Sequence, residues 1–368
     1  MALERYIGLM SGTSADGIDA VVAVFDQGRF VGVEASHHRP YAAALRASLL
    51  ALGRREQATV TLTALATLDV AVADQLSAAA QAVLAVAGLH SADIHAIGSH
   101  GQTIFHDPKT VQSSLQLGDP SRIAATTGIT VAADFRRMDV ALGGQGAPLV
   151  PAFHQAIFQT GVPTAVVNLG GIANVTLLSG AAGNPTLGFD CGPANALMDE
   201  WALRHCGSPY DINGAFAAQG TVVPALLAAW LAEPYFHLPP PKSTGRALFN
   251  LEWADALAPG GLSAYQARDV QASFCELTAR SVASSIPAGM QRVLVCGGGA
   301  FNTHLTARLA ALVAPASVST TESAGLPPQW VEAAAFAWLA HQRLHGLHGN
   351  LPAVTGAKRL AVLGGLFG

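Results

Sequence analysis

Short β-branched and apolar segments alternate along the chain with longer segments rich in Ala and Leu. Residues 6–25 are predicted to form a strand, a turn and a second strand, because β-branched and apolar residues flank a glycine-rich turn. Residues 41–53 and 59–88 repeat apolar positions at helical spacing and are predicted to be helices. Short strands are expected at 94–99 and 129–134. This alternation predicts an α/β protein.

The second half of the chain restarts the same pattern. Residues 163–178 are predicted to form a strand, a double-glycine turn and another strand, and a helix at 272–286 should lead into a strand at 292–296. A chain of 368 residues also exceeds the size at which one core usually stops growing. We therefore predict two related lobes, residues 1–150 and 151–368, with a ligand site in the cleft between them.

Composition and charge indicate a globular protein and argue against several other classes of protein. With 51% hydrophobic and 12% charged residues the chain should be globular. The net charge of -4 and the lack of long basic runs argue against a nucleic-acid partner. No segment is expected to span a membrane. The four cysteines are scattered without CxxC spacing, which argues against a zinc site or disulfides and fits a reducing cytoplasm.

Glycines cluster at three turns, residues 12–19, 168–174 and 297–302. Such clusters mark places where the backbone bends sharply or approaches a ligand closely. Around the first turn, backbone N–H groups and the hydroxyls of Ser11, Thr13 and Ser14 could surround phosphate oxygens. Neither a P-loop nor a dinucleotide fingerprint is present. The pattern therefore favours a nucleotide held between two hairpins and a glycine-rich strand end.

Three carboxylates lie near these turns. Asp16 and Asp19 would repel a bare phosphate, so they make sense if Mg²⁺ lies between them and the phosphates; an ordinary tight hairpin with surface acids is the equal alternative. Asp190, in the segment GFDCGPAN, could act as a general base. The alternative, which is the more common one for an Asp beside Gly-Pro, is that Asp190 caps this loop or the helix after it.

The opening segment YIGLMSGTSADGID, residues 6–19, resembles the signature of the anhydro-N-acetylmuramic acid kinases. Further segments agree with this family in order along the chain: SHGQT (99–103), ADFR (133–136), GGQGAPL (143–149), NLGGIAN (168–174), GFD (188–190), PKSTG (241–245), CGGG (296–299) and VTGA (354–357). The resemblance implies the two-lobed fold of sugar kinases, actin and the heat-shock chaperone ATPases. The active site would then lie in the interlobe cleft.

The resemblance also implies ATP and Mg²⁺ as cofactors. The ATP-binding residues carried over from the family are Gly12, Thr13, Ser14, Ala15, Asp16, Gly17, Ile18, Asp19, Asn168, Gly170, Gly171, Gly297, Gly298, Gly299 and Asn302. Asp16 and Asp19 would contact the metal directly or through water.

The family reaction opens the 1,6-anhydro ring of 1,6-anhydro-N-acetylmuramic acid with water and phosphorylates the released 6-oxygen. The product, N-acetylmuramic acid 6-phosphate, belongs to peptidoglycan recycling. By its place in the family motif, Asp190 would take the proton from water, and Glu332 would help to hold that water; a Glu in a first helical turn also complements the helix dipole. His100, Gln102 and Arg136 would contact the sugar, although a histidine at a strand end is as often a structural residue. Arg136, which matches the motif position better than Arg137, would hold the lactyl carboxylate. A cytoplasmic homodimer is expected.

Several features remain open at this stage. Cys191 stands where the family usually has Thr, and Ala194 where it often has Gly, so the loop around Asp190 could be displaced. Lys242 could reach a phosphate or the carboxylate, and a solvated loop lysine is the equal alternative. His341, His345 and His348 have the spacing of a metal stripe, but no ordering partner can be read from the sequence, which argues against a metal there. A kinase for another anhydro or amino sugar, and a catalytically silent ATP-binding switch, are the alternative functions.

Overall fold

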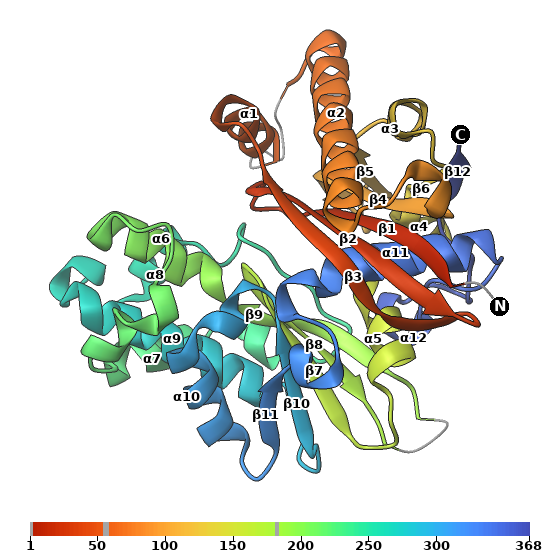
Figure 1. The fold of residues 1–368 in the computed structure, drawn as a ribbon. Coiled ribbons are helices and arrows are strands. Elements are labelled where there is room, and N and C mark those ends of the chain that lie inside the picture. Colours follow the sequence, from red (N-terminus) through yellow and green to blue (C-terminus); the bar gives the residue numbers. More distant parts are fainter. Residues whose placement is uncertain (1–2, 54–58, 181–183) are drawn as a thin grey trace. The chain divides into compact units, whose positions relative to one another are not determined.

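The computed structural model describes residues 3–53, 59–180 and 184–368, and the chain divides into two compact units (Figure 1). Unit 1 comprises Met1–Ile157 together with Trp330–Gly368, and unit 2 comprises Phe158–Gln329. The first change of unit lies close to the predicted boundary at residue 150. Residues 330–368 differ from the prediction, because they pack with the first unit and not with the second.

Within the described residues, unit 1 is built on a seven-stranded sheet in the order β12-β6-β4-β1-β2-β3, with β5 paired to β4. Its strands are β1 (Glu4–Ser11), β2 (Gly17–Asp26), β3 (Arg29–Pro40), β4 (Ala96–Asp107), β5 (Ser113–Leu117), β6 (Val131–Ala133) and β12 (Gly365–Phe367). Strands β1 and β2 form the predicted antiparallel hairpin, and β4 runs parallel to β1 on its other side.

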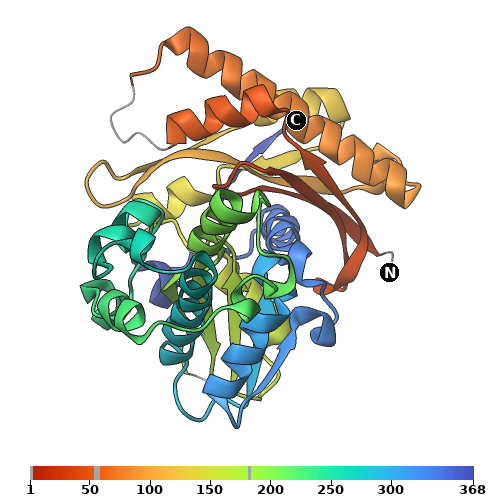
Figure 2. The same ribbon diagram turned by 90° about the vertical axis from the view of Figure 1, so that its left-hand side faces the viewer.

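Helices cover both faces of this sheet. Figures 1 and 2 show α2 on one face and α11 on the other. The helices that begin in unit 1 are α1 (Ala43–Gly53), α2 (Leu62–Ala87), α3 (Pro120–Thr127), α4 (Phe135–Ala141), α5 (Val150–Phe158), α11 (Val331–Leu344) and α12 (Pro352–Thr355). Helix α2 begins where the Thr61 side chain accepts from the N–H of Ala64, and it ends at Gly88, whose φ of 67° is the left-handed conformation.

Helix α11 lies directly on two neighbouring strands because both carry glycine at the crossing. Gly8 of β1 pairs with Gly98 of β4. A Cβ at Gly8 would collide with the carbonyl of Ala333, and a Cβ at Gly98 with that of Phe336. This contact explains why residues 330–368 belong to unit 1, and it fixes the first half of α11 against the sheet.

Among the described residues, α2 is the one unbroken helix with the length and apolar composition of a membrane span. Eight of its side chains, from Val72 to Leu84, are buried against the sheet of unit 1. Its other positions include Asp74, whose carboxylate accepts from Arg122 Nε at 2.6 Å. A buried apolar face and a paired charged face are the pattern of a helix that covers a protein core.

Within the described residues, unit 2 contains a five-stranded sheet in the order β11-β10-β7-β8-β9. Its strands are β7 (Thr164–Leu169), β8 (Ile172–Leu178), β9 (Leu187–Pro193), β10 (Arg292–Cys296) and β11 (Ser317–Thr320). Its helices are α6 (Asn195–Cys206), α7 (Pro224–Leu231), α8 (Leu251–Leu257), α9 (Ala267–Ser284) and α10 (Thr303–Val313). Alternate side chains of the sheet enter a core that includes Trp201, Trp230 and Phe274.

The two sheets repeat one topology. In each, three strands form an antiparallel meander, and two later strands add in parallel on the other side of the first strand. The series β6-β4-β1-β2-β3 in unit 1 therefore corresponds to β11-β10-β7-β8-β9 in unit 2. This agrees with the two related lobes expected from the paired glycine hairpins.

Candidate functional site

The first glycine turn joins β1 to β2. The turn is tight: the N–H of Ala15 donates to the carbonyl of Gly12 at 3.1 Å, and Ala15 has a φ of 50°. The side chains of Ala15 and Ile18 are buried, so these two residues could bind a ligand only through their backbone. Thr13 and Asp16 are exposed, and Ser14 is partly exposed.

Gln102 holds this turn from the neighbouring strand β4. Its Nε2 donates to the carbonyl of Gly12 at 3.0 Å, and its Oε1 accepts from the Ser11 hydroxyl at 2.6 Å. Ser11 is buried and its hydroxyl also lies 2.9 Å from the carbonyl of Gly17. The expectation that the Ser11 hydroxyl faces phosphate is wrong, because that hydroxyl is directed inward. Both the nitrogen and the oxygen of the Gln102 amide bond to the turn, so Gln102 is a positioning residue.

His100 and Arg136 form a second contact to the same turn. Arg136 Nε and Nη2 donate to His100 Nε2 at 3.2 and 2.8 Å, so that nitrogen is unprotonated. His100 Nδ1–H therefore donates, to the carbonyls of Ser11 and Gly101 at 3.1 and 2.8 Å. Burial, and then the charge of Arg136, lowers the pKa of His100 to about 3, so the ring is neutral near pH 7.

Arg136 remains a cation in a partly buried position. Burial lowers its pKa to about 10, while the carboxylates of Glu332 and Asp139 oppose that shift. The structure thus brings Glu332, at the start of α11, into the electrostatic neighbourhood of Arg136, at the start of α4. Arg136 Nη1 also donates to the carbonyl of Gly146 at 2.7 Å, which ties the guanidinium to the GGQGAPL segment.

The buried carboxylate of Asp139 holds the GGQGAPL segment through hydrogen bonds. Asp139 is fully buried and accepts from the N–H of Gly146, from Asn350 Nδ2 and from the Thr355 hydroxyl, each at 2.8 Å. A carboxylate with this many donors is satisfied without a counter-ion. Asp139 therefore accounts for two of the sequence segments, residues 143–149 and 354–357, as structural supports of Arg136.

The candidate residues of unit 2 form a row across three strands. Asn168 of β7 pairs with Asn174 of β8, which in turn pairs with Asp190 of β9. Directly opposed residues of antiparallel strands point to the same face. The flanking residues Phe189 and Cys191 enter the hydrophobic core on the other face. The row is therefore a polar set on one face of the sheet, and Asp190 is one of its members.

The loop of residues 241–245 holds Asp190 on both sides. The N–H of Asp190 donates to the carbonyl of Lys242 at 3.2 Å, and the N–H of Thr244 donates to Asp190 Oδ2 at 2.9 Å. Burial raises the pKa of Asp190 to about 6, and the Thr244 bond opposes the shift. A carboxylate with such a pKa is mostly ionised at pH 7 yet basic enough to accept a proton in a reaction.

The second glycine turn is held by the first residues of α6. The N–H groups of Ala194 and Ala196 donate to the carbonyl of Gly171, and the N–H of Asn195 donates to that of Gly170, at 2.9 to 3.1 Å. Asn195 Nδ2 adds a bond of 2.8 Å to the carbonyl of Leu169. This turn is anchored mainly by backbone groups.

The third glycine segment runs along the end of β7. A Cβ at Gly297 would collide with Asn168, and one at Gly299 would lie 2.7 Å from Leu169 Cβ, so only glycine fits at this approach. Asn302 is buried, and its Oδ1 accepts from the N–H of Leu305 as the cap of α10. Its side chain is thus occupied in holding the segment.

Three further residues, Thr244, Asn195 and Arg246, contribute contacts that the sequence did not reveal. Thr244 and Asn195 act through the bonds described above. The exposed Arg246 guanidinium lies 3.4 Å from the position a Cβ would take at Gly171, beside the second turn. Lys242 is not a freely solvated lysine, because its Nζ donates to the carbonyls of Tyr235 and Phe236 at 3.3 and 3.2 Å.

Cys191 does not take part in this chemistry. Its thiol is fully buried on the core side of β9, and burial raises its pKa to about 12. The thiol is therefore protonated near pH 7 and cannot act as a nucleophile. Because Cys191 faces away from the row, its replacement of the usual Thr leaves the Asp190 carboxylate in place.

The two acids of the first turn already have partners. Asp16 Oδ1 accepts from Arg46 Nη2, and Asp19 Oδ1 lies against His38 Nδ1, each at 2.7 Å. Burial raises the pKa of Asp19. Both pairs are partly exposed and therefore weak, so the carboxylates remain chemically suited to a hydrated Mg²⁺ ion.

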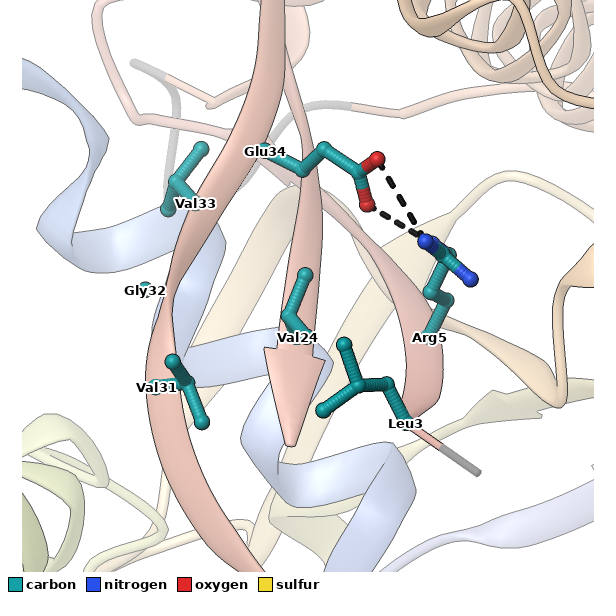
Figure 3. Close-up of a pocket in the computed structure, with 7 residues that line it drawn as sticks. All are labelled: Leu3, Arg5, Val24, Val31, Gly32, Val33 and Glu34. Carbon is teal, nitrogen blue, oxygen red and sulfur yellow. Dashed lines mark hydrogen bonds and ion pairs between the residues drawn. The ribbon is translucent and has the colours of Figure 1, made fainter. Parts of the chain in front are cut away.

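A shallow hollow elsewhere on unit 1 is a separate feature (Figure 3). It has a volume of about 250 Å³ and is lined by Leu3, Arg5, Val24, Val31, Gly32, Val33 and Glu34. Arg5 Nε donates to Glu34 Oε2 at 2.7 Å beside its apolar side chains. The hollow shares no residue with the candidate site.

These features define a two-unit α/β protein of the kind that includes sugar kinases and actin-like ATPases. The fold is similar to that of (R)-2-hydroxyglutaryl-CoA dehydratase component A from Acidaminococcus fermentans. The TM-score is 0.50, and the two chains are 12% identical over 93% of this chain and 99% of that one. The fold class expected from the sequence is confirmed.

The chain belongs to the anhydro-N-acetylmuramic acid kinase family, whose pattern matches residues 4–368. Curated relatives carry that name in Pseudomonas putida, at 48% identity over 99% of both chains, and in Xanthomonas oryzae pv. oryzae, at 50% identity over 98% of this chain and 97% of the relative. A relative of the same name in Coxiella burnetii is 46% identical over 100% of this chain and 98% of its own.

Proposed function

We propose that the protein is an ATP-dependent kinase that opens 1,6-anhydro-N-acetylmuramic acid with water and phosphorylates its 6-oxygen, giving N-acetylmuramic acid 6-phosphate. The single observation that carries this proposal is the Asp190 carboxylate, held by the 241–245 loop with a pKa raised to about 6. Family membership supplies the substrate, since the relatives are named for it.

Asp190 takes a proton from water while the water oxygen bonds to the anomeric carbon. The bond between that carbon and the 6-oxygen breaks, and the 6-oxygen attacks the γ-phosphorus of ATP, releasing ADP. General-base assistance of this kind contributes about 10² to 10⁴ in rate, and positioning of the phosphates contributes much of the rest.

Unit 1 would supply the carboxylate recognition and one phosphate turn. Arg136 carries a fixed positive charge whose direction is set by His100 and Gly146. A planar guanidinium suits the lactyl carboxylate that distinguishes a muramic acid from other amino sugars. Glu332, close enough to influence Arg136, would help to hold the attacking water. The Gly12–Asp19 turn would offer its backbone N–H groups to the phosphates.

Unit 2 would hold the rest of the nucleotide. The Gly170–Gly171 turn would face the phosphates, and Arg246 beside it would add positive charge there. Gly297, Gly298 and Gly299 would lie along the adenosine. Asp16 and Asp19 would hold Mg²⁺, which neutralises phosphate charge when it is bound.

A cytoplasmic location and a homodimer complete the proposal. The four cysteines, Cys191, Cys206, Cys275 and Cys296, lie among the described residues and are free thiols, as a reducing compartment requires. The homodimer comes from the family resemblance.

The test is the replacement Asp190→Asn. Turnover of ATP with the anhydro sugar should fall by about 10² to 10⁴, because the base is lost, while the affinity for ATP stays within a few-fold. In the wild type, kcat/KM should rise with pH through about 6 as the carboxylate ionises, and the variant should lack this limb. Asp26→Asn, at the exposed end of β2, is the matched control and should be unchanged.

Two further results distinguish the alternatives. Reaction in ¹⁸O water should label the anomeric hydroxyl of the product, and an unlabelled product would refute hydrolytic opening. An anhydro sugar without the lactyl ether should bind less well to the wild type, with the difference reduced in Arg136→Lys. Equal turnover of both sugars would indicate a broader sugar kinase, and no turnover of either would favour the silent ATP switch.

A further inference from the structure

Three potential metal ligands come together at the C-terminal end of α11, and Glu332 lies at the other end of this helix. Glu4 lies at the start of β1, and His341 and His345 lie one turn apart at the end of α11. One ligand atom from each residue lies within 4.8 Å of the others. His341 lies nine positions after Glu332, about 14 Å along the helix axis, so this cluster is separate from the candidate kinase site.

The hydrogen bonds of His341 leave its Nε2 lone pair available. Gln342 Nε2 donates to the carbonyl of His348 at 3.0 Å, so its Oε1 must be the amide atom that meets His341 Nδ1 at 3.2 Å. His341 Nδ1 therefore carries the proton, and Nε2 is unprotonated. His341 is only 1% exposed, and its Nε2 atom is buried. This atom has no hydrogen-bond partner within the described part of the chain.

The ring is also held in orientation by its neighbours. Phe25 stacks on His341 with the ring centroids 4.6 Å apart and the planes at 8°. A buried imidazole with an unused acceptor normally costs free energy. A second-shell acceptor on Nδ1 and a free Nε2 are what a metal-binding histidine requires.

Glu4 is oriented in the same way. The Tyr6 hydroxyl donates to Glu4 Oε2 at 2.8 Å, and His345 Nε2 lies 3.0 Å from the same oxygen. Tyr6 is fully buried, so its hydroxyl fixes the carboxylate at one edge of the cluster. His345 has a side chain that is 44% exposed and can turn to adjust the distance between ligand atoms.

We propose that Glu4, His341 and His345 bind one divalent transition-metal ion, such as Zn²⁺. With metal–nitrogen distances of about 2.0–2.1 Å, tetrahedral ligands lie about 3.4 Å apart. The three ligand atoms lie within 4.8 Å of one another, so binding would need only small movements of the partly exposed Glu4 and His345 side chains. Two imidazoles and a carboxylate leave a further position for water. The ion would clamp the start of β1 to the end of α11, and the sequence stripe His341, His345 and His348 would contribute two of its members.

Isothermal titration of tag-free, EDTA-treated full-length protein with ZnCl₂ tests this proposal. The wild type should bind one ion per chain with a Kd in the micromolar range or below, and its unfolding temperature should rise. His345→Gln and Glu4→Gln should each weaken that event at least 10-fold and abolish the rise. His348→Gln is the matched control, because His348 is exposed and outside the cluster, and it should behave as the wild type.

Co²⁺ provides an independent readout. Its visible absorption should report coordination by the wild type and by His348→Gln, and should change in the two cluster variants. Circular dichroism confirms that each variant is folded, and Glu4→Asp, which keeps the carboxylate, should retain more affinity than Glu4→Gln. Absence of one-to-one binding in the wild type, or equal binding by all variants, would overturn the proposal and leave Glu4 and His345 as an ordinary ion pair.

Discussion

The glycine hairpins of the two units have the same topology but are held in different ways. The turn of unit 1 is braced by side chains of β4, namely Gln102 and the His100 that orients Arg136. The turn of unit 2 is braced by the backbone N–H groups of Ala194 to Ala196. The same topology is therefore held in two ways. The side-chain bonds in unit 1 depend on which residues are present, whereas the backbone bonds in unit 2 could be made by most residues.

The strands beneath the two turns also differ. In unit 1 the neighbouring strands carry Gly8 and Gly98, on which α11 lies. At the corresponding positions of unit 2, four residues before the turn, Val166 pairs with Leu294. In unit 1 the absence of side chains at Gly8 and Gly98 thus lets α11, which carries Glu332, pack directly on the sheet.

The largest expected effect is at this helix contact. Gly8→Ala should destabilise the protein by about 3 kcal/mol, because the new methyl would collide with the backbone of α11 at Ala333, which cannot move as a flexible side chain could. Thermal unfolding followed by circular dichroism should show a transition lowered by about 2–4 °C per kcal/mol.

Gly32→Ala, in β3 of the same sheet, is the control. A Cβ there meets nothing within 4 Å, so its transition should stay close to that of the wild type. If Gly8→Ala were equally well tolerated, the close approach of α11 to β1 would be incorrect.

Much of this fold follows from local sequence patterns. The β1–β2 and β7–β8 hairpins were predicted because β-branched strands flank glycine turns. The placement of residues 330–368 was not predictable in this way. It depends on a contact between α11 and two glycines more than 200 residues away, Gly8 and Gly98, which no local period reports.

The candidate site shows the same limit. Family motifs identified Asp190, Arg136 and the glycine turns, yet motifs cannot tell a ligand from its support. Gln102 and Lys242 seemed available to ligands, whereas in the structure their polar atoms bond to the protein itself. That distinction depends on tertiary hydrogen bonds and burial.

The two anchors should respond differently to loss of a side chain. Gln102→Leu should lower kcat/KM for ATP by about 10-fold to 100-fold, because it removes the side-chain donor to the Gly12 carbonyl and one of the two acceptors beside the Ser11 hydroxyl, so the turn is held less firmly. Asn195→Ala should cost less than about 10-fold, since the backbone bonds to Gly170 and Gly171 remain. Steady-state kinetics at saturating sugar measure both.

Gln116→Leu on the adjacent strand β5 is the matched control for Gln102. Its amide donates to Thr103 and Ser114, not to the turn, so kinetics should be nearly unchanged. A larger loss in Asn195→Ala than in Gln102→Leu would reverse the comparison between the two anchors.

The smallest expected effect concerns the acids that only the first turn carries. Asp19→Asn should raise the Mg²⁺ concentration for half-maximal turnover by about 3-fold to 10-fold, because Asp19 is the more buried acid and a lost partly exposed charge contact is worth about 1 kcal/mol. Asp16→Asn should change it less, since that side chain is 61% exposed and paired with Arg46. Turnover measured across Mg²⁺ concentrations, with Asp26→Asn as control, decides the order; a larger shift for Asp16 would place the metal nearer the tip of the turn.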